Sequence, residues 1–310
     1  MAHYSIQPER STLHGSFSRD FEPVLTINSG DSICFRTLDA GWGMEPFSAP
    51  GIRKRFEPRE SSRDGGHALC GPVFIRGAEP GMTLEIKINE IRLGSWGWNS
   101  AGGFPHPLNN SLGLADGEEY HLNWNLDNDL MIGTSDKGHK ITLRPFMGVM
   151  GMPPNEPDIH STFPPRFCGG NIDCKELIAG STLYLPIPVS GGLFSVGDGH
   201  AVQGDGEVGC PALECPMDAV NLEFRVREDI NIKMPRAKTP TSWITMGFHE
   251  DLDEASIIAL DGMLDLMCDL YGFERKEVLA LSSLVVDLRI TQIVNGVRGV
   301  HAVLTHGSIR

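Results

Sequence analysis

Hydrophobic and polar residues alternate along much of the first 248 positions of the chain. The alternation is clearest in residues 82–91 and 220–226, where apolar side chains recur at every second position over most of the stretch. This period places the apolar side chains on one face, as in a half-buried β-strand. Two further apolar segments, residues 23–27 and 32–37, flank a turn signal, Asn-Ser-Gly-Asp. The pattern predicts a mainly β fold.

Helical periodicity is confined to the last part of the chain. Residues 251–271 begin with acidic side chains, as the helix dipole favours, and they end at Gly272. Their apolar residues are spread around more than one face, which is typical of a helix buried on more than one side. We expect a second helix over residues 274–284, followed by strands over 285–294 and 299–304.

Residues 94–130 differ from both patterns, because they are rich in Gly, Asn, Trp and Asp and show little periodicity. We expect a long, ordered loop region there that covers a site, in which Trp96 and Trp98 either line a pocket or pack at a strand end. No repeat or clear linker divides the chain. We therefore predict one compact unit or two parts with a soft boundary, namely a β-rich part over 1–165 and a second part over 166–310.

The composition narrows the choice of partners. Acidic residues outnumber basic ones by 40 to 26, for a net charge of −14. This excess disfavours a nucleic acid or an anionic membrane as a partner and suits a small neutral ligand. The N-terminus lacks the apolar segment of a signal peptide, and the seven cysteines form no CxxC pair. We therefore expect a cytoplasmic protein with reduced thiols.

Candidate chemistry is concentrated in residues 197–207, which follow an apolar, strand-like run. If the strand continues, Asp198 and His200 project from one face, and Asp205 and Glu207 repeat the same spacing. A carboxylate and an imidazole on one strand face can share a divalent cation such as zinc. The other two carboxylates provide a base to handle water.

Further motifs lie on both sides of this segment. Gly-Gly-Asn-Ile-Asp occupies residues 169–173, and Gly-Ser-Thr-Leu-Tyr-Leu-Pro occupies 180–186. Phe-Met-Gly-Val-Met-Gly precedes them at 146–151, and Val-Asp-Leu-Arg-Ile-Thr-Gln follows at 286–292. In this order, and over most of the chain, the motifs resemble those of the acetamidase/formamidase family of small-amide hydrolases.

The resemblance implies a fold of β-sandwich and barrel-like parts with a small α+β portion at the C-terminus. It also implies an amidohydrolase that hydrolyses a short linear amide, formamide or acetamide, to a carboxylate and ammonia. Family members tend to self-associate, and this favours a homodimer. A non-catalytic metal-binding or small-ligand-binding β protein is the alternative, with the same side chains holding a structural ion.

The resemblance also assigns expected roles to the candidate residues. We expect a divalent metal on Asp173, Asp198 and His200, with zinc favoured by the mixed ligands and calcium or manganese admitted by additional carboxylates. Glu207 or Asp205 would act as the base. Three more residues would contact the substrate or support the ligands, namely Asn171, Gln203 and Glu214.

Each candidate also has a simpler interpretation. Asp198 and His200 could form a solvated turn pair, and Asp173 could cap a helix at residues 175–177. Asp205 and Glu207 would be acceptable in any hairpin turn. Glu214 could be an ordinary strand carboxylate, and Gln203 could make only local hydrogen bonds.

Cysteine chemistry is a further possibility. Cys168 and Cys174 lie near Lys175 and Glu176, and some amidases combine a cysteine nucleophile with lysine and glutamate. That chemistry requires side chains from separate elements, whereas these are close in sequence. Because most free cysteines are buried apolar side chains, we expect these two only to pack.

Overall fold

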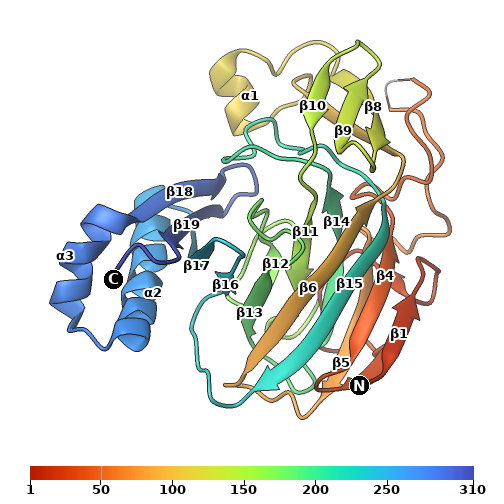
Figure 1. Cartoon of the computed structure of the whole chain (residues 1–310). Helices are drawn as coiled ribbons and strands as arrows, with labels where there is room; N and C mark the ends of the chain where they lie inside the picture. Colours follow the sequence, from red (N-terminus) through yellow and green to blue (C-terminus); the bar gives the residue numbers. More distant parts are fainter. Residues whose placement is uncertain (50) are drawn as a thin grey trace.

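The described residues, 1–49 and 51–310 of a computed structural model, are mainly β, as predicted (Figure 1). The largest sheet has nine strands in the order β1 (His3–Ile6), β4 (Ser32–Thr37), β15 (Met217–Arg227), β6 (Thr83–Leu93), β13 (Thr182–Pro186), β16 (Arg236–Lys238), β17 (Ser242–His249), β19 (Arg298–Thr305) and β18 (Val286–Gln292). Most neighbours in it are antiparallel, and β1 pairs with β4 in parallel.

Two smaller sheets complete the β structure. A six-stranded sheet contains β12 (Gly169–Asn171), β11 (Phe146–Gly151), β14 (Phe194–His200), β5 (Leu69–Arg76) and β2 (Leu13–His14) in that order, with β3 (Leu25–Asn28) paired to β5. A four-stranded sheet contains β10 (Lys140–Thr142), β9 (Ile132–Ser135), β8 (Tyr120–Asp127) and β7 (Trp96–Ala101).

The nine-stranded and six-stranded sheets share one hydrophobic core. Apolar residues at alternate positions of β6, such as Leu84 and Ile86, are fully buried in it. Phe224 of β15 meets Phe194 of β14 edge to face, with ring centroids 5.0 Å apart, so side chains of the two sheets interdigitate. The alternation seen in the sequence therefore identifies the inner face of a sheet correctly.

The C-terminal residues extend the large sheet and cover it with helices α2 (Leu252–Tyr271) and α3 (Arg275–Val285). The Asp251 side chain accepts hydrogen bonds from the first-turn amides of Asp253 and Glu254, and Gly272 ends α2 in a left-handed conformation. Gly247 of β17 lets α2 approach closely, because a Cβ atom there would lie 2.1 Å from the Ala255 carbonyl oxygen.

The prediction for residues 94–130 was wrong in part. This segment forms β7, the short helix α1 (Pro107–Leu112) and β8, and β7 pairs with β8 in antiparallel register. Its strands mix polar and aromatic residues, and β7 contains a glycine, so they lack a clear apolar period. The segment nevertheless borders the candidate site, as described below.

Strands from both predicted parts of the chain alternate in the large sheet. β4 and β6, from residues 1–165, lie on either side of β15, from residues 166–310. The six-stranded sheet is mixed in the same way, with β14 between β11 and β5. None of the described helices is long and apolar enough to cross a membrane.

Candidate active site

The candidate site begins at the end of β14, which extends to His200. Asp198 and His200 lie two residues apart on this strand and are almost fully buried. His200 Nε2 is 3.4 Å from Asp198 Oδ1 and 3.3 Å from Glu214 Oε1. The two side chains therefore share one strand face, and a solvated turn pair is excluded.

Asp173 reaches the same place from the loop that follows β12. Its ligand-capable oxygen lies within 4.8 Å of those of Asp198 and His200. Asn295 Nδ2 donates a hydrogen bond to Asp173 Oδ2 at 2.8 Å, and Gln203 Nε2 donates to the Asp173 carbonyl oxygen at 2.8 Å. Residues 175–176 form a turn and residue 177 is not helical, so Asp173 caps no helix there.

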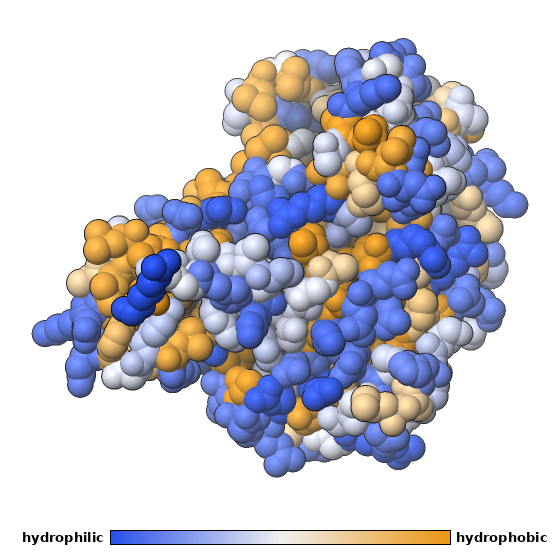
Figure 2. Space-filling model, viewed as in Figure 1, coloured by the Kyte–Doolittle hydropathy of each residue, from blue (hydrophilic) through white to orange (hydrophobic). Residues whose placement is uncertain are grey.

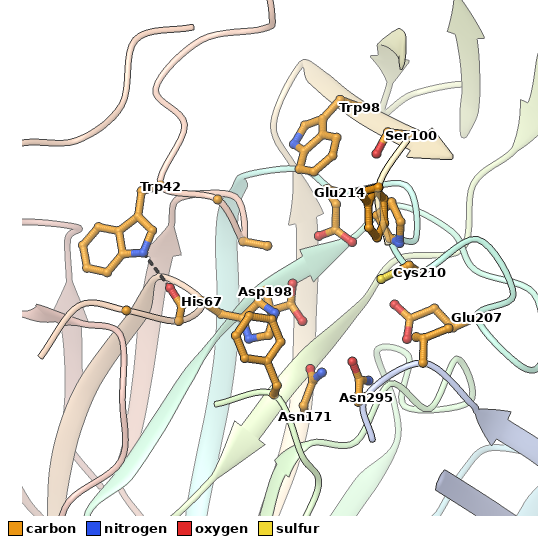
Figure 3. A pocket seen from close by; sticks show the side chains of 18 of the residues that line it. Trp42, His67, Trp98, Ser100, Asn171, Asp198, Glu207, Cys210, Glu214 and Asn295 are labelled. Atoms are coloured by element: carbon orange, nitrogen blue, oxygen red, sulfur yellow. Dashed lines mark hydrogen bonds between the residues drawn. The ribbon is translucent and has the colours of Figure 1, made fainter. Parts of the chain in front are cut away.

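Glu207 and Glu214 complete the cluster. Their carboxylate oxygens lie within 4.8 Å of a ring nitrogen of His200 and of each other, and both side chains are buried. The structure thus brings together one imidazole and four carboxylates, from Asp173, Asp198, Glu207 and Glu214. Figure 3 shows Asp198, Glu207 and Glu214 directed toward a common space.

Three of these acidic residues have a left-handed backbone. The φ angles are +51° at Asp173, +58° at Asp198 and +47° at Glu207. Residues other than glycine rarely adopt positive φ angles. Backbone strain of this kind is concentrated at functional sites, where the surrounding structure holds it in place. The conformation therefore indicates that the orientation of these carboxylates matters more than local backbone stability.

Gly148 of β11 forms the floor beneath the cluster. A Cβ atom at this position would lie 2.4 Å from Asp198 Oδ2, 2.7 Å from Asp173 Oδ1 and 2.8 Å from His200 Cε1. Only glycine leaves room for three side chains to converge over the strand. The motif at 146–151 therefore serves the site through the small size of Gly148. The sequence alone did not reveal this role.

Burial and mutual repulsion shift the pKa values of the cluster. Burial raises the pKa of Asp173 to about 8 and that of Glu214 to about 7, against the attraction of His200. It also raises the pKa of Glu207 well above its ordinary value. Burial lowers the pKa of His200, but the charges of Glu214 and Asp198 outweigh this effect, so the pKa is well above the ordinary value.

The donor set fits a divalent cation. Several buried atoms of the cluster have no hydrogen-bond partner among the described residues: Asp173 Oδ1, Glu207 Oε2, Glu214 Oε2 and His200 Nδ1. Buried polar atoms are normally paired, and carboxylates crowded together repel each other unless a positive charge lies between them. Oxygen and imidazole ligands suit zinc, manganese or calcium.

The cluster opens into a pocket of about 590 Å³. Asp198, Glu207 and Glu214 lie in its wall beside the amides of Asn171 and Asn295. Trp98 and other residues of the segment 94–130 also line the pocket, so this segment does border the site as expected. Trp96 does not line this pocket.

Not all predicted site residues come together. Asp205 lies in a turn, and its Oδ2 is 3.0 Å from Lys175 Nζ, so it forms an ion pair outside the cluster. Cys168 and Cys174 are fully buried, and burial raises the pKa of each thiol to about 12. Neither cysteine lines the pocket, and their high pKa leaves almost no thiolate to act as a nucleophile.

Sequence reasoning missed Gly148, His67 and Asn295. His67 lines the pocket, and its Nδ1 lies 2.8 Å from Thr162 Oγ1. Asn295 follows β18 and reaches the site because Ile293 N donates to the Gly206 carbonyl oxygen at 3.1 Å. The sequence analysis identified the neighbouring motif at 286–292, but this motif ends before Asn295.

The fold and the site together define a class of protein, a β-sandwich with a buried acidic centre in the wall of a pocket. Within this class, the chain is similar to the acetamidase/formamidase family. The sequence profile described as "Acetamidase/Formamidase family" matches residues 157–305. The resemblance seen in the sequence motifs is thereby confirmed.

Individual relatives agree with this similarity. A formamidase of Methylophilus methylotrophus is 28% identical over 200 residues, which are 48% of this chain and 49% of the relative. An acetamidase of Mycolicibacterium smegmatis is 28% identical over 207 residues, 48% of this chain and 50% of the relative. These matches therefore span about half the length of the curated relatives.

Structural similarity covers nearly the whole chain. The crystal structure of a recombinant predicted acetamidase/formamidase from Thermoanaerobacter tengcongensis has a TM-score of 0.85 and 25% sequence identity. The alignment covers 98% of this chain and 96% of that one.

Proposed function

We propose that this chain is a metal-dependent amidohydrolase that converts a primary carboxamide to a carboxylate and ammonia. Formamide and acetamide are the smallest candidate substrates, as the names of the relatives suggest. The observation that carries the proposal is the cluster of four buried carboxylates and one imidazole facing the pocket. The similarity to the acetamidase/formamidase family supports the reaction class.

Asp173, Asp198 and His200 would hold the ion. A bound divalent ion would polarise the amide carbonyl and lower the pKa of water toward about 7. The protein keeps these ligands in place through a second layer of contacts. Asn295 and Gln203 fix Asp173 by hydrogen bonds, and Glu214 lies against the ring of His200.

Glu207 is the base in this proposal. Its buried carboxylate lines the pocket, and one oxygen has no hydrogen-bond partner among the residues that the structure describes. It would take a proton from the attacking water and pass it to the amide nitrogen. The transfer is required because an amide anion is too poor a leaving group to depart unprotonated. Asn171 offers its side-chain N–H to the carbonyl oxygen as negative charge develops there.

Ammonia release from metal-analysed protein tests the proposal. We expect about one divalent ion per chain, and elemental analysis would identify it as zinc, manganese or calcium. His200→Ala should lose most of the ion and most of the activity. His139→Ala is the matched control, because that residue is exposed and lies outside the pocket lining.

Two results would contradict the proposal. Full occupancy and full activity of His200→Ala would remove His200 from the site. One bound ion per chain without ammonia release from any amide would favour the alternative, a non-catalytic metal-binding β protein.

A further inference from the structure

The pocket above the acidic cluster is larger than a formyl or acetyl group requires. Its volume is about 590 Å³, within the range of roughly 300–1,000 Å³ of pockets that bury drug-sized ligands. Formamide carries only a hydrogen on its carbonyl carbon, and acetamide carries only a methyl group. Either molecule would leave most of the pocket to water, so its size points to a larger acyl group.

Aromatic rings form part of the lining, which also includes Arg55, Arg59 and Glu119. The acidic residues Asp198, Glu207 and Glu214 and two asparagines form the polar part of the wall. Figure 3 shows Trp42 away from Asn171 and Asn295, whereas His67 lies beside Asp198 and Trp98 beside Glu214. The rings that line the pocket are Trp42, His67, Trp98, Phe104, His106 and Phe163. Flat, polarisable rings of this kind favour contact with a flat, apolar ring over a flexible chain.

Hydrogen bonds hold three of these rings in place. Trp42 Nε1 donates to the Gly66 carbonyl oxygen at 2.8 Å, and Trp98 Nε1 donates to Asp39 Oδ2 at 2.6 Å. Asp39 is itself paired with the buried Arg53. His67 Nδ1 lies 2.8 Å from Thr162 Oγ1. Because the rings are already ordered, a ligand that packs against them loses little side-chain entropy on binding.

Phe163 is the ring most available to a ligand. It lies against His67, with ring centroids 4.7 Å apart, yet 48% of its surface is exposed. Contact between this half-exposed apolar side chain and an apolar ligand would be favourable in free energy, because it removes apolar surface from water.

We infer that the substrate is an aromatic carboxamide of the arylacetamide type, whose ring packs among the aromatic side chains while its carboxamide reaches the acidic cluster. The inference rests on the proposed function, because it names the acyl group for the same reaction. Water adds its oxygen to the carbonyl carbon, the C–N bond breaks, and the proton goes to the nitrogen. The products are an arylacetate and ammonia.

Steady-state kinetics of the metal-loaded protein test the inference, with phenylacetamide and acetamide as the two substrates. We expect kcat/KM to be at least about tenfold higher for phenylacetamide, since even one methylene group in an apolar pocket changes specificity by roughly tenfold or more. Phe163→Ala should lower the ratio of the two values several-fold. Phe167→Ala is the matched control, because Phe167 is also exposed, at 42%, but does not line the pocket, and its ratio should not change.

The outcomes separate this inference from the proposed function. Acetamide turnover equal to or better than phenylacetamide turnover, or a ratio unaffected by Phe163→Ala, would overturn the inference and leave the amidohydrolase intact. If neither amide is hydrolysed, the proposed function fails, and calorimetric titration with phenylacetamide decides the rest. Binding that Phe163→Ala weakens would retain the aromatic site, whereas no binding would remove it.

Discussion

Glu207 and Asp205 illustrate how backbone conformation decides the role of a side chain. The sequence spacing suggested that both acids project from one face, as in a strand. The chain instead turns at these residues, and Glu207 has a φ angle of +47°. Glu207 therefore points into the buried cluster, while Asp205 pairs with Lys175. A period of two applies only where the backbone is extended.

The first prediction tests this difference in role. Glu207→Gln should keep the fold and the metal but lose turnover by a factor on the order of 10²–10⁴, because the amide cannot carry the proton. Asp205→Asn should stay within a few-fold of the parent. Turnover of both variants is compared at equal metal content.

Other results would reassign the residues. An equal loss in Asp205→Asn with an unaffected Glu207→Gln would move the base to Asp205. Loss of the metal in Glu207→Gln would make Glu207 a ligand instead.

Residues contributed from distant parts of the chain set the limit of sequence reasoning. Asp198, His200 and Glu207 could be predicted because they lie within ten positions in a glycine-rich segment. Asn295 and Gly148 could not, since each acts only through contacts that the fold creates. Asn295 binds Asp173 across 122 positions of sequence, and Gly148 acts through the side chain that it lacks.

At the scale of elements, the position of β11 beside β14 in the six-stranded sheet assembles the cluster. The two strands are antiparallel neighbours, and Phe146 pairs with His200 and Val149 with Gly197. Gly148 lies between these pairs, directly under Asp198 and His200. The close approach of β11 to the site side chains therefore depends on the missing Cβ atom.

Gly148→Ala should accordingly displace the site side chains. The added methyl group would overlap Asp198, Asp173 and His200, and overpacking of this kind costs about 1–3 kcal/mol of unfolding free energy. We expect lower metal occupancy and a lower thermal midpoint, measured by elemental analysis and calorimetry. Gly204→Ala is the control, because a Cβ atom there meets nothing within 4 Å. Full occupancy with an unchanged midpoint in Gly148→Ala would refute the role of this glycine.

Elements with strong local signals were predicted well, and those without them were not. The helix over 251–271 has an acidic cap at one end and Gly272 at the other, and the structure places α2 within one residue of it. β7 and β8 were predicted to be loop because polar and aromatic residues are mixed along both strands and a glycine interrupts β7. Such strands are specified by pairing with each other, and pairing leaves little trace in a single sequence.

The whole molecule has an exposed apolar surface near its C-terminus. β18 is at the end of the nine-stranded sheet, and Figure 2 shows apolar surface on the part of the molecule formed by α3 and β18. Helix α3 packs against α2 but leaves several large apolar side chains exposed on these elements, namely Ile257, Leu270, Leu279, Leu284, Leu288 and Ile290. The sheet and α3 therefore cover only part of the apolar surface in this region.

We propose that a second copy of this chain covers this surface. The outer edge of β18 carries hydrogen-bonding groups that an antiparallel β18 of a partner could pair under two-fold symmetry, and Leu288 and Ile290 would pack at the same contact. Light scattering at micromolar concentration should give about twice the chain mass.

The double variant Leu288→Lys, Ile290→Lys should be monomeric, because it places like charges opposite each other across the two-fold axis. Leu130→Lys, at a leucine that is 69% exposed and lies between β8 and β9, should remain dimeric. A monomeric parent protein would exclude the dimer, and a dimer that survives the double substitution would place the contact elsewhere, in both cases without affecting the argument for the active site.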